Sequence, residues 1–238
     1  MNEPEVSTPT DRWEVVTLPD REAAVTFAVA HFIETGRQAI EERGLFSVAL
    51  SGGSTPKAIY SMLSQPDIAP LLDWSRVLLF FSDERAVPPD HEESNFRMAM
   101  SYLSKLPLNE DHIFRMQAEH DIEVQAAAYE HLLKTKCEGV LDLTMLGMGT
   151  DGHTASLFPE TDALSADDRL VVPNYIPKLD AWRLTLTFPC INASRNIVLY
   201  VLGEEKREMM TEVFKDDGRF PVQRVGEALW ITDVDLRD

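Results

Sequence analysis

The stretch LDLTMLGMGTDGHTASLFP, residues 141–159, decides the fold of this chain. Residues 141–146 are apolar or β-tolerant and predict a buried strand. Residues 147–152 form a glycine-spaced turn, and residues 153–157 are typical of the first turn of a helix. A strand, a glycine turn and a helix start together mark the place where an open α/β sheet binds its ligand. We therefore predict a crevice here, with the imidazole of His153 at its mouth.

Three further junctions carry polar groups at predicted strand ends. They are SGGST after 45–50, SDER after 77–81, and GEEK after 196–202. Because the carboxyl ends of parallel strands open to one side of a sheet, we expect all four junctions to meet in one crevice. The predicted fold class is α/β: Rossmann-like, with a mainly parallel sheet flanked by helices. The alternating segment 182–189 could add a small antiparallel portion.

Length and charge limit the class of protein. We expect a single α/β domain over residues 12–238 and a flexible, proline-containing tail over residues 1–11. The net charge of −18 argues against nucleic acid and anionic membrane as partners. The start of the chain has no apolar signal segment, and no apolar run approaches the roughly 20 residues of a membrane span. We expect a cytoplasmic protein that acts on a small molecule, as a monomer or weak homodimer.

The turn after the second predicted strand is a candidate phosphate cradle. Gly52 and Gly53 let the backbone approach a ligand, and Ser54 and Thr55 add hydroxyl donors. A proline at the predicted first helical position suits a helix start with free N–H groups. The GxxxxGK[ST] spacing of a Walker A loop is absent. An ordinary glycine-rich turn without a ligand is an equally weighted alternative at this stage.

An acidic protein that binds a small anion needs a local cluster of cations, because salt screens charges over about 8 Å. Arg85 offers a planar guanidinium that suits phosphate; the alternative is a loop arginine paired with a neighbouring carboxylate. Lys206 stands at another strand-to-helix junction. Two cations leave His153 available for proton transfer. The sequence has no zinc-ligand spacing, and we expect neither a metal nor a cofactor.

Four segments together resemble the family of glucosamine-6-phosphate deaminases and 6-phosphogluconolactonases. They are LSGGSTPKAIY, FFSDERAVPPDHEESNF, LGMGTDGHTASLFP and LTLTFPCINASRNIVLYVLGEEK. The resemblance runs from about residue 20 to 234, and DGHTASLFP and SDERxVP are typical of the lactonase branch. It implies a Rossmann-like fold and hydrolysis of 6-phosphoglucono-δ-lactone to 6-phosphogluconate in the pentose phosphate pathway.

The resemblance also implies site roles. His153 is expected to be the general base for attack of water on the lactone carbonyl, with Arg85 and Lys206 on the phosphate. Arg207 follows the lysine directly and is a second candidate for that contact.

Two carboxylates keep two interpretations each. Asp151 either holds the tautomer of the imidazole or stabilises the turn, and Asp83 either anchors a loop or accepts a sugar hydroxyl. Gly152 belongs to the glycine turn, whose N–H groups we expect to donate to the oxyanion.

Two other functions remain open from the sequence. An aldose-ketose isomerase or deaminase could use the same fold on a sugar phosphate. A non-enzymatic phosphosugar sensor belongs to another class; such sensors usually carry a DNA-binding helix-turn-helix, for which residues 1–19 leave no room.

Overall fold

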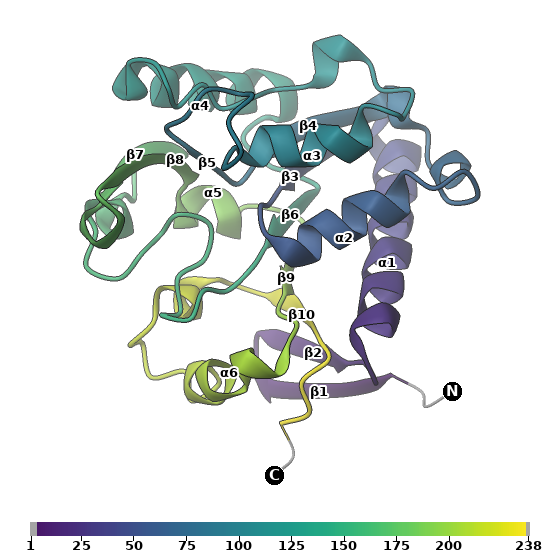
Figure 1. Ribbon diagram of the computed structural model, residues 1–238, viewed down its shortest axis with the longest axis vertical. Helices are drawn as coiled ribbons and strands as arrows, with labels where there is room; N and C mark the ends of the chain where they lie inside the picture. The colour runs from purple at the N-terminus through teal and green to yellow at the C-terminus, as the bar shows by residue number, and fades with distance from the viewer. Residues whose placement is uncertain (1–3, 237–238) are drawn as a thin grey trace.

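The computed structural model describes residues 4–236. Its main sheet has the strand order β1-β2-β10-β9-β6-β3-β4, and only β1 runs antiparallel to its neighbour (Figure 1). A smaller antiparallel sheet has the order β5-β8-β7. The strands are β1 (Glu5–Thr10), β2 (Trp13–Thr17), β3 (Phe46–Leu50), β4 (Val77–Phe81), β5 (Asp83–Arg85), β6 (Leu143–Leu146), β7 (Val171–Ile176), β8 (Ala181–Leu186), β9 (Ile197–Tyr200) and β10 (Ala228–Thr232).

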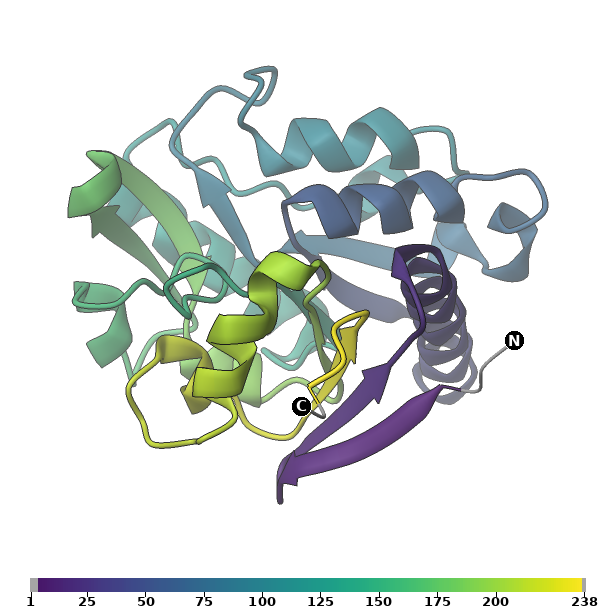
Figure 2. The same cartoon turned by 60° about the horizontal axis from the view of Figure 1, so that its bottom comes forward.

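Helices cover both faces of the main sheet. They are α1 (Arg21–Arg43), α2 (Ser54–Leu63), α3 (Asn95–Leu103), α4 (Ile122–Cys137), α5 (Phe188–Asn192) and α6 (Arg207–Val213). The first three lie together on one side, and the last three lie on the other (Figures 1 and 2). The predicted fold class, a mainly parallel α/β sheet with a small antiparallel portion, is confirmed.

Local sequence signals explain where these elements begin and end. Asp20 caps α1 by accepting the N–H of Ala23, and Gly44 ends this helix at φ 84°. Asp121 caps α4 in the same way. The apolar runs of β3, β4, β6 and β9 are buried along their whole length, as expected for strands covered on both faces.

The predicted flexible tail over residues 1–11 differs from what the structure shows. Glu5–Thr10 forms β1, which pairs with β2 along the edge of the main sheet (Figure 2). Its side chains are nearly all exposed, so no apolar alternation marks it; the open edge of β2 supplies the backbone partners. Residues 1–3 lie outside the described residues.

The helix start that we predicted at residues 153–157 is wrong. The chain instead makes a tight turn there, with a bridge between Thr154 and Leu157 and a left-handed φ of 47° at Ala155. The hydroxyl of Thr154 donates to the carbonyl of Gly147 at 2.8 Å, a bond that folds the turn back onto the end of β6. The chain then crosses to the small sheet rather than into a helix.

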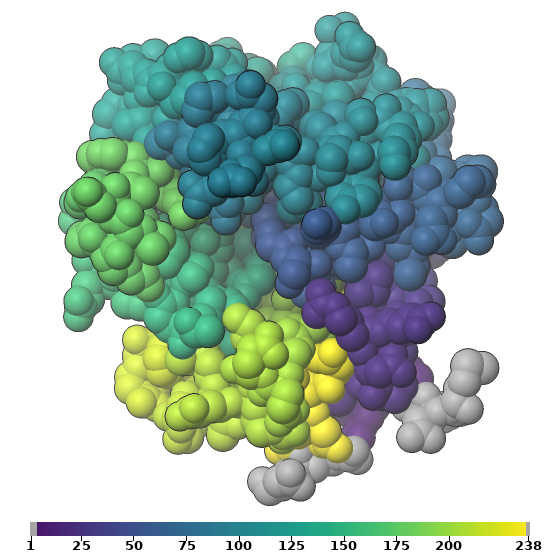
Figure 3. All heavy atoms as spheres, in the orientation of Figure 1, coloured from purple at the N-terminus to yellow at the C-terminus, as the bar shows by residue number. Residues whose placement is uncertain are grey.

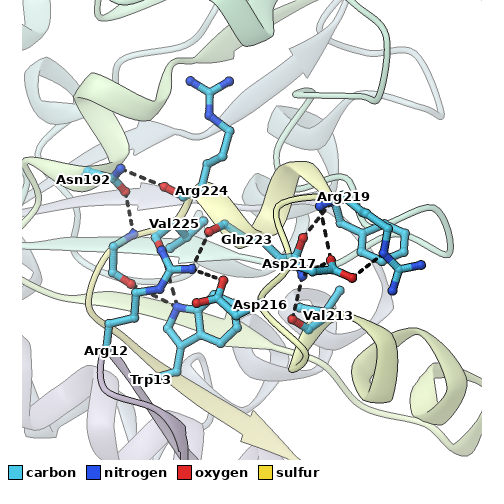
Figure 4. Close-up of polar contacts among 12 residues, drawn as sticks. Arg12, Trp13, Asn192, Val213, Asp216, Asp217, Arg219, Gln223, Arg224 and Val225 are labelled. Carbon is cyan, nitrogen blue, oxygen red and sulfur yellow. Dashed lines mark hydrogen bonds and ion pairs between the residues drawn. The ribbon is translucent and has the colours of Figure 1, made fainter.

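The segment 216–226 is fastened to the start of β2. The guanidinium of Arg12 donates to the carbonyls of Gln223 at 2.7 Å and Val225 at 3.1 Å, and it pairs with Asp216 (Figure 4). The Gln223 amide in turn donates to the carbonyl of Val213 at 2.9 Å. The first and last parts of the chain are thereby joined.

Candidate active site

A cavity of about 430 Å³ lies just beyond the carboxyl ends of β3, β4 and β6. Its lining comes from the turn after β3, from β5, from Asn95 at the start of α3, and from the hairpin formed by β7 and β8. Residues 147–158 complete it; this segment is called the catalytic turn, after the role proposed for His153. Figure 3 shows segments that are far apart in the sequence gathered around this hollowed face. The predicted meeting of strand ends is therefore present for three of the four junctions, and the fourth reaches the lining through Lys206.

His153 lines this cavity and is held on several sides. Its Nδ1 contacts Oδ1 of Asp151, whose oxygen also accepts the backbone N–H of His153 at 3.2 Å. The imidazole stacks on the ring of Phe158, with centroids 3.8 Å apart and planes 21° apart. With a proton on Nδ1 donated to the carboxylate, Nε2 is left as a proton acceptor.

Burial keeps the imidazole neutral. It lowers the pKa of His153 from 6.5 to about 4; the charge of Asp83 opposes this shift, and those of Lys206 and Arg183 add to it. At neutral pH the ring is therefore an unprotonated base.

The glycine at position 149 makes room for the ring. A Cβ added there would lie 2.1 Å from both Cε1 and Nδ1 of His153. A Cβ at Gly147 would meet no heavy atom within 4 Å. The imidazole can therefore lie this close only because residue 149 is glycine, whereas position 147 has room for a side chain.

Gly152 faces away from the cavity. Its carbonyl accepts the N–H of Val222 at 2.9 Å, and a Cβ on it would come within 2.7 Å of the Phe220 side chain. Its φ of 72° also favours glycine. Gly152, which we expected at the substrate, is not among the residues that line the cavity; it joins the catalytic turn to the segment 216–226 behind it.

Two arginines face each other across the small sheet. Arg85 on β5 is the register partner of Arg183 on β8, and both line the cavity. The buried Nε atoms of both have no hydrogen-bond partner in the part of the chain that the structure describes. Within these residues Arg85 forms no ion pair either, so the alternative of a carboxylate-paired loop arginine is not what is observed; one terminal nitrogen donates to the carbonyl of Glu93.

Such a pair is unfavourable without an anion. Burial lowers the pKa of Arg183; Asp83 opposes this shift, whereas the adjacent charge of Arg85 adds to it. Buried donors left unsatisfied cost free energy that a bound oxyanion would recover.

Asp83 is held on both oxygens. Oδ2 accepts the hydroxyl of Ser156 at 2.6 Å, and Oδ1 accepts the amide of Asn95 at 3.3 Å. These bonds favour the anchoring role, since they tie the catalytic turn and α3 to the same carboxylate. A Cβ at Gly52 would lie 2.0 Å from Oδ1 of Asn95, so this glycine is needed for the same packing.

The SGGST turn contributes Ser51 and its two glycines to the lining, but not the hydroxyls of Ser54 and Thr55. Gly52 and Gly53 line the cavity, whereas Ser54 and Thr55 begin α2 and are not part of the lining. The proline that we expected at the first helical position is the third residue of α2. The first residue of the turn, Ser51, is held by the buried hydroxyl of Tyr60. This hydroxyl accepts the N–H of Ser51 and donates to its carbonyl.

Lys206, rather than Arg207, reaches the catalytic turn. Its Nζ donates to the carbonyl of Met148 at 3.0 Å, and Met148 lines the cavity. The guanidinium of Arg207 is engaged by Glu204 and by the carbonyl of Asp235.

The family described as glucosamine-6-phosphate isomerases/6-phosphogluconolactonase matches residues 19–231. The chain belongs to this family. The resemblance seen in the motifs is thus confirmed.

Several relatives in the lactonase branch of the family are similar over most of their length. A 6-phosphogluconolactonase of Chlamydia pneumoniae is 42% identical over 90% of this chain and 85% of its own. One from Nostoc sp. is 37% identical over 92% and 95%. Among solved structures, the 6-phosphogluconolactonase from Thermotoga maritima has a TM-score of 0.81 at 31% identity, covering 92% of this chain and 98% of its own.

Two of the N–H groups of the glycine turn that we expected to donate to the oxyanion are already bonded within the turn. The N–H of Gly149 donates to the carbonyl of His153 at 2.9 Å, and that of Gly152 donates to the carbonyl of Gly149 at 3.1 Å. These two N–H groups stabilise the turn itself. Any backbone donor to an oxyanion must therefore come from other positions.

The sequence did not predict Arg183, Phe158 and Lys178, which also line the cavity. A signal for Arg183 was present, because the alternation in LTLTF continues back to place this arginine on the polar face of β8. That face is turned toward the cavity rather than toward water. For Lys178, on a hairpin tip, no local signal exists.

The described residues contain neither a metal-binding cluster nor a membrane-spanning helix. Within residues 4–236, no three His, Cys, Asp or Glu side chains come together as a metal site. Nor does any helix in this range have the length and apolarity needed to cross a membrane.

Proposed function

We propose that this chain hydrolyses 6-phosphoglucono-δ-lactone to 6-phosphogluconate, a step of the oxidative pentose phosphate pathway. The observation that carries the proposal is one cavity that holds both a neutral, carboxylate-oriented imidazole and two guanidinium groups whose Nε atoms have no hydrogen-bond partner within residues 4–236. The first suits attack on an ester, and the second suits a phosphate dianion. Relatives named as 6-phosphogluconolactonases support the choice of substrate.

His153 acts as the general base. Its Nε2 takes a proton from water while the water oxygen bonds to the lactone carbonyl carbon. The bond from that carbon to the ring oxygen then breaks, and the imidazolium returns the proton to the departing oxygen. Asp151 keeps the Nδ1 proton in place throughout. A positioned base of this kind typically accelerates a reaction about 10²- to 10⁴-fold.

Three cations hold the phosphate. Arg85 and Arg183 offer their Nε donors from the small sheet, and Lys206 adds an ammonium beside the catalytic turn. The backbone at Gly52 and Gly53 lies open on the same cavity. Local cations of this kind outweigh the overall negative charge of the chain once an anion is inside the cleft.

Lactone loss measured against the spontaneous rate tests the proposal. The purified protein should hydrolyse the phosphorylated lactone with a kcat/KM of roughly 10⁴–10⁸ M⁻¹s⁻¹. Unphosphorylated glucono-δ-lactone is the matched control and should be a poorer substrate. Ammonia release from glucosamine 6-phosphate, without lactone hydrolysis, would assign the chain to the deaminase reaction instead. Binding of both compounds without turnover would make it a sensor.

A further inference from the structure

We infer that Lys178 is a positioning residue for the catalytic pair: it holds the second oxygen of Asp151 and thereby fixes His153. This inference rests on the proposed function and deepens it. It assigns a task to the hairpin between β7 and β8, which brings a cation across to a turn that precedes it in the sequence by 27 residues.

The hairpin presents this lysine from a well-defined turn. A 3-10 turn, Pro177–Leu179, connects the two strands, and the pair Ile176–Ala181 closes the ladder. Asp180 adopts a left-handed φ of 47°, and its N–H donates to the carbonyl of Pro177 at 3.2 Å. Its carboxylate also accepts the hydroxyl of Tyr175.

Lys178 contacts both groups that flank the imidazole, the carboxylate of Asp151 and the ring of Phe158. Nζ pairs with Oδ2 of Asp151, whose Oδ1 contacts Nδ1 of His153. The same Nζ lies 4.6 Å from the ring centroid of Phe158, on which the imidazole stacks. The ammonium group of Lys178 thus contacts both Asp151, which accepts the imidazole proton, and Phe158, on which the imidazole stacks.

This pairing serves orientation more than folding. The side chain of Lys178 is 51% exposed, and half-exposed ion pairs contribute little to the free energy of unfolding. A carboxylate held at both oxygens, however, keeps a fixed plane. When Oδ2 is released, Asp151 can rotate toward water, and a small displacement of the base costs rate.

Lys178 also lines the cavity, so direct binding of substrate is the competing role. The two roles predict different kinetics. A substrate-binding lysine raises KM when removed, whereas a positioning lysine lowers kcat and leaves KM nearly unchanged.

Steady-state kinetics of Lys178→Met and Lys178→Arg test the inference. We expect Lys178→Met to lower kcat about 5-fold with KM nearly constant, and Lys178→Arg to restore most of the loss. Lys134→Met is the matched control, since Lys134 is 57% exposed and pairs with Glu130 on α4. Its kcat should stay at the wild-type value.

The same change in an Asp151→Asn background completes the cycle. If Lys178 acts through Asp151, Lys178→Met should lower kcat no further in that background. Independent, multiplying losses would overturn the inference, as would a rise in KM alone, or a Lys178→Met enzyme equal to wild type. Failure of the proposed function is distinguishable, because then the wild-type protein itself would not hydrolyse the lactone.

Discussion

The two sides of the cavity are built in opposite ways. On the catalytic turn, Nδ1 of His153 and both oxygens of Asp151 have partners. On the small sheet, the buried Nε atoms of Arg85 and Arg183 have none among the described residues. In the proposed reaction, the first side is complete before substrate arrives and the phosphate completes the second. Proton transfer would then be preorganised, whereas anion binding would use donors that have no partner among the described residues.

The two sides also differ in what supports them. The catalytic turn depends on close packing at glycine and on the N–H of Val222 behind it. The arginines depend on strand pairing, with Arg85 and Arg183 in register. Changes on the first side should therefore alter rate, and changes on the second should alter affinity.

Removal of the base is the largest expected effect. In His153→Gln, kcat should fall about 10²- to 10⁴-fold while KM changes little, because no other described group takes over the proton. Steady-state kinetics on the lactone measure this. A near-normal kcat would remove His153 from its role and with it the division between the two sides.

The next largest effect is expected from a substitution that crowds the imidazole. Gly149→Ala should lower kcat about 100-fold, because its Cβ would stand 2.1 Å from the ring and displace it. Gly147→Ala is the matched control, since a Cβ there meets nothing within 4 Å and should leave kcat intact. Equal losses in both variants would show that the turn needs glycine for backbone reasons instead.

Loss of one guanidinium should act on affinity. Arg183→Gln is expected to raise KM for the phosphorylated lactone about 10-fold or more, as for loss of a charge-assisted hydrogen bond. The KM for the unphosphorylated lactone should barely change. Inorganic phosphate should raise the Tm of the wild type more than that of the variant. A fall in kcat with unchanged KM would contradict the assignment.

The smallest effect concerns pH. Since burial lowers the pKa of His153 from 6.5 to about 4, kcat/KM should persist to about pH 4 before the ring is protonated. Between these values the unfolded chain binds a proton at this position that the folded chain does not. The free energy of unfolding should therefore rise with pH across that window.

Denaturant titrations at several pH values measure this slope, and His153→Gln should flatten it. His31 adds a slope of the same sign, because burial lowers its pKa as well. An activity loss centred near pH 6.5 would mean that the ring is not desolvated.

Apolar runs and caps made much of the fold predictable. The strand predicted at 77–81 matches β4 residue for residue, and Asp20 caps α1 through a hydrogen bond to a residue three positions along the chain. These signals are local. β1 was missed because pairing with an exposed sheet edge needs no apolar face. The turn at 153–157 was mistaken for a helix because its side-chain hydroxyls bond to distant groups that the sequence pattern does not reveal.

The residues of the candidate site also divide into those that local sequence signals predict and those that they do not. His153 and Arg85 were predictable because each follows a buried strand of the sheet, where ligands bind. Lys178 and Arg183 come from a hairpin whose position depends on how the small sheet packs against the large one. Ser54 and Thr55 were included on the basis of their hydroxyls, but α2 begins so that they lie outside the lining.

The last strand of the chain occupies an inner place in the main sheet: β10 lies between β2 and β9. A ribosome makes this strand after every residue that lines the cavity, so the nascent chain first carries β2 without its parallel neighbour. The N–H of Val222 that steadies the catalytic turn is also synthesised late. The residues that line the cavity are therefore synthesised before the strand and the N–H group that support them.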